Sequence, residues 1–175
     1  MTDSVTNIVI AGLGGQGVVK ASEILAGAAF RAGFDVKKSE VHGMSQRGGS
    51  VTSDVRYGAE VFSPMVPPAE ADYLLVLEES EAAVNRPRLR PGGVLLAASE
   101  LYDDDRLERI RANRTLNVAM LGALSAHLEI PEEDWLDAIR ANLPEKAQDA
   151  NIHVFERGRA AEKLMGYVTR LIGAD

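Results

Sequence analysis

The chain begins with a short apolar run that is followed by a helical repeat. Asn7-Ile-Val-Ile-Ala11 is continuously apolar after its first residue, which is typical of a central parallel strand covered on both faces. From about Val18 to Ala32, apolar residues recur at helical spacing, and Gly33 then ends the pattern. A second strand is predicted from Val36 to Val41. Because crossovers are right-handed, the two strands are expected to run parallel as a βαβ unit.

The next stretch has the period of a strand that is exposed on one side. Apolar and polar residues alternate from Val51 to Tyr57, which predicts a half-exposed strand over residues 50–57. Gly58 then favours a hairpin or bend into Val61-Phe62. We therefore expect an antiparallel hairpin excursion within a mostly parallel sheet.

Strands and helices alternate through the middle of the chain, and helices dominate its last third. A buried strand over residues 71–77 precedes a short helix over about 79–86, and a Pro91-Gly92-Gly93 turn leads into a strand over 94–98. The later helices are expected over residues 116–128, from Pro131 to before Pro144, and over about 149–171. This order predicts one α/β domain over residues 1–175, with a Rossmann-like, mostly parallel sheet and helices on both faces.

Composition narrows the classes of function. The 19 basic and 26 acidic residues give a net charge of −7, which argues against a general nucleic-acid binder. Cysteine is absent, so the chain cannot ligate an iron–sulfur cluster through thiolates. The three histidines lie far apart in sequence, and no metal site is predicted. Neither a membrane-spanning run nor a signal peptide is evident, so a cytoplasmic protein without a membrane partner is expected.

The first strand leads directly into a glycine-rich turn. Gly12-Leu-Gly-Gly-Gln-Gly17 matches G-x-G-x-x-G in its strand–turn–helix setting, where backbone amides and the helix N-terminus form an anion site. Glu40 lies about 20 residues further on, where a dinucleotide-binding fold places its ribose-binding acid. The alternative is a tight turn that packs closely and binds nothing. The candidate binding residues here are Gly12, Gly14, Gly15, Gln16, Gly17 and Glu40.

A polar, glycine-bearing loop from Glu40 to Ser50 holds the other candidate chemistry. Its glycines let a ligand or a second chain approach the backbone, and the guanidinium of Arg47 suits a carboxylate or a phosphate. A salt bridge to Glu40 is the alternative for Arg47. Histidine is a residue type that can act as an acid or a base near neutral pH, so the role of His42 is either acid–base chemistry or a fixed loop hydrogen bond. The loop therefore adds Gln46, Arg47, Gly48 and Gly49 as binding candidates, with His42 and Arg47 as possible contributors to catalysis.

Taken together, the glycine turn and the segment from Ser39 to Val51 resemble the gamma subunits of the 2-oxoacid:acceptor oxidoreductases, in particular the small subunit of the indolepyruvate:ferredoxin branch. The resemblance spans residues 7–100 and continues through residues 117–122 and 155–158. It implies a thiamine-diphosphate-dependent assembly that oxidatively decarboxylates a 2-oxoacid, here an aryl pyruvate, to acyl-CoA and passes the electrons to ferredoxin.

The same resemblance implies a division of labour between two chains. This chain has no thiolates for clusters and no thiamine-binding acid-and-metal motif, so thiamine diphosphate, Mg²⁺ and iron–sulfur clusters are expected on a larger partner subunit. Coenzyme A would be a co-substrate, and this chain alone would hold no cofactor tightly. The expected role is to close one wall of the partner's active site, without activity in isolation.

Two other functions fit the glycine turn. One is an NAD-dependent reductase of Rossmann type, which predicts that the isolated chain binds NADH. No Tyr-Lys or Ser-His arrangement supports that chemistry. The other is a free-standing nucleotide-sensing module, which predicts nucleotide binding without a large partner.

Overall fold

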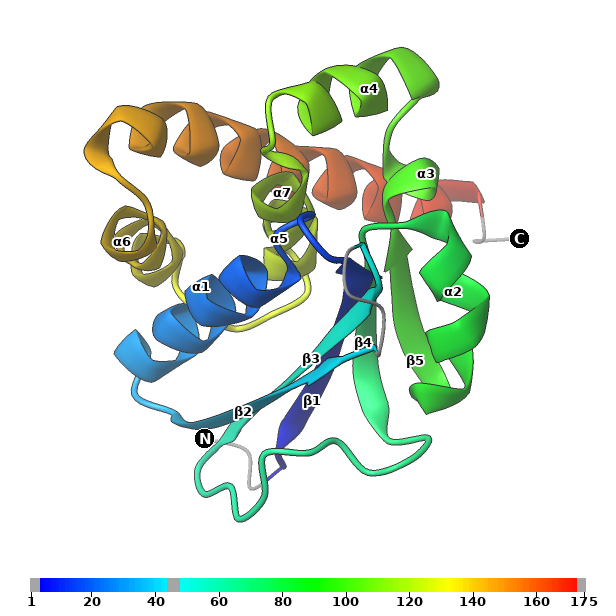
Figure 1. Cartoon of the computed structure of the whole chain (residues 1–175), viewed down its shortest axis with the longest axis vertical. Helices are drawn as coiled ribbons and strands as arrows, with labels where there is room; N and C mark the ends of the chain where they lie inside the picture. The colour runs from blue at the N-terminus through cyan, green and yellow to red at the C-terminus, as the bar shows by residue number, and fades with distance from the viewer. Residues whose placement is uncertain (1–3, 44–47, 173–175) are drawn as a thin grey trace.

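The computed structural model describes residues 4–43 and 48–172, with side chains as far as Leu164, and contains one five-stranded sheet in the order β2-β3-β1-β4-β5 (Figure 1). The strands are β1 (Thr6–Leu13), β2 (Asp35–His42), β3 (Ser50–Gly58), β4 (Ala71–Val76) and β5 (Leu89–Ala97). β4 pairs in parallel with both β1 and β5, whereas β3 is antiparallel to both β1 and β2. The predicted Rossmann-like α/β fold with an antiparallel excursion is confirmed.

The antiparallel excursion has a different partner from the one predicted. β3 forms its hairpin with the preceding strand β2, and residues 61–62 lie in an irregular connection. Val55 of β3 lies opposite both Lys38 of β2 and Ile8 of β1. β2 therefore runs in the same direction as β1, as the βαβ pattern predicted, but β3 separates the two strands and leaves β2 at the edge of the sheet.

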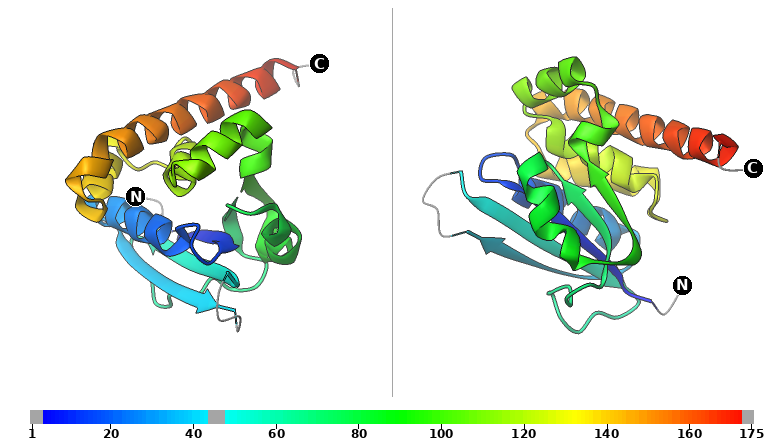
Figure 2. Two further views of the ribbon diagram at one scale, coloured as in Figure 1. Left: turned by 45° about the horizontal axis from the view of Figure 1, so that its top comes forward. Right: turned by 90° about the vertical axis from the view of Figure 1, so that its right-hand side faces the viewer.

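The two faces of the sheet are covered unequally. Side chains alternate between the faces, so Ile8 and Ile10 enter the larger core while Val9 and Ala11 enter the smaller one. Helices α1 and α5 lie over the larger core, with α6 packed on α1 and α7 packed on α5 (Figure 2). These helices are α1 (Val18–Arg31), α5 (Leu116–Ser125), α6 (Glu132–Asn142) and α7 (Glu145–Ile172). Helix α2 (Glu79–Asn85), the 3-10 turn Arg86–Arg88 and the connection over residues 59–70 cover the other face.

Two expected boundaries were wrong. The Pro91-Gly92-Gly93 segment lies inside β5, where the register with β4 shifts and Gly92 has a φ of 76°. This irregularity keeps the strand continuous through a sequence that is typical of a turn. Helix α7 begins at Glu145, directly after Pro144 and before the predicted start near residue 149. Two short helices that the sequence pattern did not resolve, α3 (Ala98–Leu101) and α4 (Asp104–Ala112), follow β5.

Helices α5 and α7 are in unusually close backbone contact. A Cβ atom placed on Gly122 would lie 2.1 Å from the carbonyl oxygen of Phe155, and one on Gly158 would lie 2.1 Å from that of Ala119. All ten residues of α5 are buried. Glycine at both positions lets the two backbones touch, and α7 can then insert Phe155 beside Trp135 of α6, with ring centroids 5.6 Å apart.

The helices in the described part of the chain are too short or too polar to cross a lipid bilayer.

Candidate functional site

Three segments meet at the edge of the sheet where the parallel strands end. They are the glycine turn between β1 and α1, residues 48–50 at the start of β3, and residues 78–81 at the start of α2. The backbone N–H of Gly14 donates a hydrogen bond to the carbonyl of Gly49 at 2.9 Å. The structure thus brings together the two segments that the sequence singled out, at the edge where open α/β sheets bind ligands.

Gln16 braces the glycine turn from within. Its Oε1 accepts a hydrogen bond from the N–H of Leu13 at 2.8 Å, and its Nε2 donates to Oε2 of Glu78 at 2.7 Å. Gly12 leaves room for this arrangement, since a Cβ there would lie 2.9 Å from Gln16 Oε1 and 3.2 Å from Leu77 Cβ. The side chain of Gln16 is therefore committed to the turn, and a ligand would meet the backbone around it.

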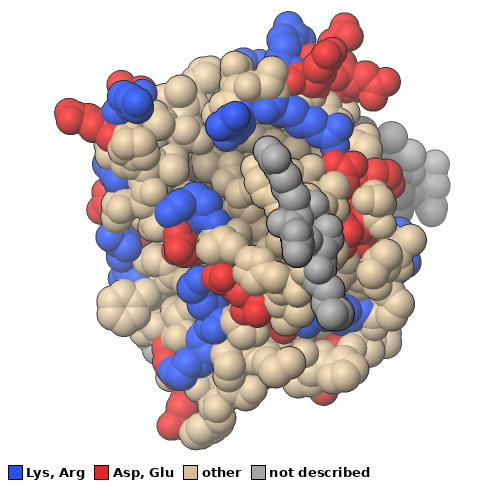
Figure 3. Space-filling model, viewed as in Figure 1, with Lys and Arg blue, Asp and Glu red and all other residues tan. Residues whose placement is uncertain are grey.

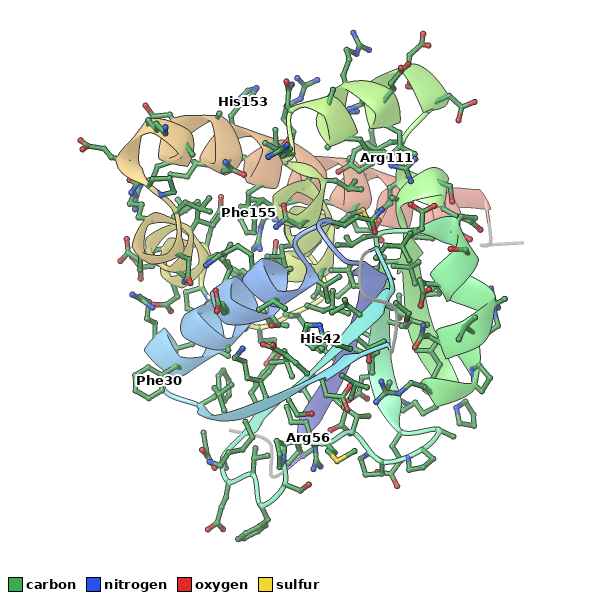
Figure 4. All side chains as sticks on the ribbon, viewed as in Figure 1. Phe30, His42, Arg56, Arg111, His153 and Phe155 are labelled. Atoms are coloured by element: carbon green, nitrogen blue, oxygen red, sulfur yellow. The ribbon has the colours of Figure 1, made fainter. Side chains whose placement is uncertain are left out.

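The N-terminus of α1 opens onto a cleft of about 310 Å³. Gly17 precedes the helix with a φ of 83° and no side-chain cap, and the N-terminal end of α1 carries the partial positive charge of the helix dipole. The cleft is lined by Gly15, Gln16, Gly17, Arg111, Arg114, Leu116 and Asn117. Figure 4 shows Arg111 between α4 and the carboxyl ends of the strands, and basic side chains gather below α4 in Figure 3.

Arg111 and Arg114 are the site residues that sequence reasoning missed. Nη2 of Arg111 lies 3.7 Å from Oε2 of Glu78, the carboxylate that also holds Gln16. Arg114 has a φ of 55°, in the left-handed region, as the chain turns from α4 towards α5. No local motif marks either arginine, because both belong to a charged segment that is typical of a solvated helix. Only the packing of α4 above the sheet brings them to the glycine turn.

On its other side the glycine turn faces a second depression of about 410 Å³, which includes His42. His42 ends β2 on the same face as α1, with its side chain 60% exposed and Nε2 3.8 Å from a carboxylate oxygen of Glu40 (Figure 4). Gly14, Gly15 and Gly17 line the same depression. His42 thus lies beside the glycine turn in an open position.

Glu40 does not lie where a dinucleotide-binding fold needs its ribose-binding acid. It is opposite Ser53 of β3, and β3 separates it from β1. The inserted strand moves Glu40 away from the glycine turn by the spacing of one strand, about 5 Å. A hydrogen bond from Lys38 at 2.6 Å holds the pKa of Glu40 below its usual range. This placement counts against an NAD site at the turn.

Of the remaining candidates in the loop from Glu40 to Ser50, the structure describes Gly48 and Gly49. Gly48 has a φ of 68°, and the carbonyl of Gly49 faces the glycine turn. Gln46 and Arg47 lie outside the described residues, so their role stays a prediction. Within the described residues no three His, Cys, Asp or Glu side chains gather closely enough to hold a metal ion by themselves.

Comparison with known proteins connects this site to one family. The family model described as pyruvate ferredoxin/flavodoxin oxidoreductase matches residues 7–161. Subunit IorB of the indolepyruvate oxidoreductase from Thermococcus kodakarensis is 35% identical, over 91% of this chain and 98% of that protein. Its counterpart from Pyrococcus horikoshii is 34% identical, over 91% and 96%.

Solved structures share the fold. The gamma subunit of a keto/oxoacid ferredoxin oxidoreductase from Geobacter sulfurreducens has a TM-score of 0.72 and 25% identity, covering 91% of this chain and 99% of that one. The 2-oxoglutarate:ferredoxin oxidoreductase from Magnetococcus marinus, solved with 2-oxoglutarate, coenzyme A and succinyl-CoA bound, has a TM-score of 0.79. It is 20% identical, and the match covers 93% of this chain and 32% of that one, so the likeness concerns the fold alone.

Proposed function

This chain belongs to the pyruvate ferredoxin/flavodoxin oxidoreductase family, and on that premise we propose that it acts as the small subunit of an indolepyruvate-type oxidoreductase. The family and the class of enzyme predicted from the sequence are confirmed. The assembly would oxidatively decarboxylate an aryl 2-oxoacid to its acyl-CoA and pass the electrons to ferredoxin. We keep the cytoplasmic location predicted from the sequence as part of this proposal.

The chemistry of its side chains assigns this subunit a binding role. The chain has no cysteine for an iron–sulfur cluster, and its described residues do not form a metal site. Thiamine diphosphate, Mg²⁺ and the clusters therefore belong on the larger partner subunit in this proposal. What this chain contributes is one wall of the active site, built from the glycine turn, the start of β3 and the arginines below α4.

The observation that carries the proposal is the cationic cleft at the N-terminus of α1. Both substrates of the proposed reaction are anions, since a 2-oxoacid has a carboxylate and coenzyme A has phosphates. Arg111 and Arg114 offer guanidinium donors beside Gly15 and Gly17, and the dipole of α1 adds a partial positive charge at this end of the helix. Glu78 restrains Arg111 from one side, which reduces the freedom that the side chain would lose on binding.

Reconstitution with the large subunit tests this division of labour. The isolated chain should show no 2-oxoacid oxidation, and the large subunit should restore it. Arg111→Ala and Arg114→Ala should each raise the KM for indolepyruvate or coenzyme A by about tenfold or more, because hydrogen bonds to charged groups contribute about 1.5–3 kcal/mol. Arg47→Ala belongs to the same series, as the site that the sequence alone predicted.

Arg109→Ala is the matched control for these variants. It removes an exposed arginine from α4, the helix of Arg111, and the Nε of Arg109 donates to the carbonyl of Asp105 at 3.1 Å. Its kinetics should match those of the wild type. Turnover by the isolated chain would refute the division of labour, while unchanged KM values in both cleft variants would remove the cleft from the site. Enhanced NADH fluorescence with the isolated chain would favour a nicotinamide site instead.

A further inference from the structure

The three segments of the candidate site are joined by a closed circuit of hydrogen bonds. The N–H of Gly14 donates to the carbonyl of Gly49 at 2.9 Å, and the next residue, Ser50, donates from Oγ to Oε2 of Glu81 at 2.7 Å. The N–H of Glu81 donates to the carbonyl of Glu78 at 2.9 Å. The carboxylate of Glu78 then returns to the glycine turn through Gln16, at 2.7 Å.

Glu81 is the unexpected member of this circuit. It is only 6% exposed, on the first turn of α2. Burying a carboxylate costs free energy unless other groups satisfy it, so packing of α2 does not by itself explain an acid here. Its Oε2 receives the hydroxyl of Ser50 and also the Nδ2 of Asn85, at 3.2 Å. The side chain of Asn85 comes from the same helix, whereas Ser50 comes from the start of β3.

The neighbouring acid Glu79 makes a similar bond without joining the circuit. Oε2 of Glu79 accepts a hydrogen bond from the hydroxyl of Ser99, at the start of α3. Glu79 and Ser99 are both exposed, and neither contacts the glycine turn or residues 48–50 through the hydrogen bonds that the structure describes. Glu79 and Ser99 therefore form a hydroxyl–carboxylate pair whose acid comes from the same helix as Glu81, and this pair serves as a built-in comparison.

We propose that Glu81 is a positioning residue for the wall of the active site. Through Ser50 it fixes the carbonyl of Gly49 against the N–H of Gly14, so that the start of β3 and the glycine turn move as one rigid surface. The start of α2 then links the two segments, because Glu78 bonds to Gln16 of the glycine turn and Glu81 bonds to Ser50 of β3. We call this arrangement the bracket. This inference rests on the proposed function, because it assigns the bracket to the wall that this subunit would contribute.

Amide hydrogen exchange in the isolated chain tests the bracket without any activity. Ser50→Ala should speed exchange of the Gly14 amide by about tenfold, because its hydrogen bond would open more often. The amide of Leu77, which donates to the carbonyl of Ala11 at 2.9 Å, should be unchanged. Ser50→Thr keeps the hydroxyl and should restore slow exchange. Ser99→Ala, which breaks the comparison pair, should leave the Gly14 amide unaffected.

Kinetics of the reconstituted complex test what the bracket does. Ser50→Ala and Glu81→Ala, each of which removes one partner of the hydrogen bond, should raise the KM for indolepyruvate or coenzyme A by about fivefold to tenfold, with kcat within about twofold, because the binding wall loosens while the reacting groups stay on the partner. The double variant should lose little more than either single variant, since both changes break the same bond. Ser50→Thr should return the KM to the wild-type value.

The two measurements separate this inference from the proposed function. If Ser50→Ala leaves Gly14 exchange unchanged, or lowers only kcat in proportion to the amount of assembled complex, the positioning role is overturned. If the wild-type complex does not oxidise any 2-oxoacid, the proposed function fails, while Gly14 exchange still decides whether Glu81 holds the turn and β3 together.

Discussion

Glycine allows close backbone contacts in two regions of this protein, the α5–α7 helix pair and the glycine turn. It serves a different purpose in each region. Between α5 and α7, Gly122 and Gly158 have helical neighbours and allow the two backbones to touch over a fully buried surface. In the glycine turn, Gly15 and Gly17 have φ values of 93° and 83°, and the contact with Gly49 depends on one backbone hydrogen bond. The first contact excludes a ligand by close packing, whereas the second leaves a cleft beside it.

The comparison shows that the segment with a recognisable sequence motif need not be the segment where a substitution costs the most stability. The turn carries the pattern that sequence analysis detects, but its surroundings are polar and partly open. The helix pair carries no motif that the sequence analysis detected, yet a carbonyl oxygen lies only 2.1 Å from the position that a Cβ atom would take at each glycine. We therefore expect substitutions in the helix pair to act on stability and those in the turn to act on binding.

Gly158→Ala should have the largest effect. Its Cβ would overlap the carbonyl oxygen of Ala119 at 2.1 Å, and a backbone atom cannot move aside as a side chain can. The helices must separate, which should cost about 3 kcal/mol of unfolding free energy or more, well above the roughly 1 kcal/mol that alanine gains in a helix. Chemical denaturation of the isolated chain measures it. A loss below 1 kcal/mol would mean that the contact is adaptable.

Gly17→Ala should have an intermediate effect with a functional component. The positive φ costs about 1–3 kcal/mol for alanine, and the new Cβ would lie 2.5 Å from Nδ2 of Asn117, which lines the cleft. Gly33→Ala is the control, because Gly33 follows the other end of α1, away from the cleft, with a similar φ of 89° and no atom within 4 Å of its Cβ. Both should lower the Tm, but only Gly17→Ala should also raise the KM of the complex. Equal kinetics in the two variants would contradict a role for the Asn117 side of the cleft.

Gly27→Ala should have the smallest effect, and with the opposite sign. Gly27 lies within α1, and the nearest atoms to its Cβ would be Nη1 of Arg31 at 3.4 Å and the Cβ of Ala138 at 3.5 Å. Both are ordinary contacts, so helix propensity decides the outcome and should add about 0.5–1 kcal/mol of stability. The Tm should rise by about 2–4 °C at most. A fall in Tm would show that α1 and α6 pack too tightly to accept a methyl group.

Local patterns in the sequence predicted most elements of the fold but not how the strands are ordered. The apolar run before Gly12 and the alternation from Val51 to Tyr57 identified β1 and β3 as strands. The prediction that β3 is half-exposed was wrong, because Ser53 and Asp54 are both buried and no residue of the strand is exposed. The pattern of apolar and polar residues along a strand does not depend on which strands lie next to it in the sheet. The insertion of β3 between β2 and β1 was therefore invisible locally, and with it the displacement of Glu40 from the glycine turn.

The candidate site was predictable where backbone chemistry defines it. The glycine turn and Gly49 were identified from residue type, and the structure places them in contact. Arg111 and Glu81 could not be identified in this way, because a charged residue on a short helix has the same local pattern whether it meets solvent or a distant loop. Their roles follow from tertiary packing, which brings α4 and α2 to the same edge of the sheet.

The hairpin between β2 and β3 has a consequence for how members of this family could come to prefer different substrates. Since β2 and β3 pair along their whole lengths, the segment that joins them can be grafted from one relative to another without disturbing the register of either strand. Its two described ends, Gly43 and Gly48, leave the sheet beside the glycine turn, so under the proposed function we expect such a graft to change the substrate preference of the complex. The kinetics of chimaeras that exchange residues 43–49 would test this expectation.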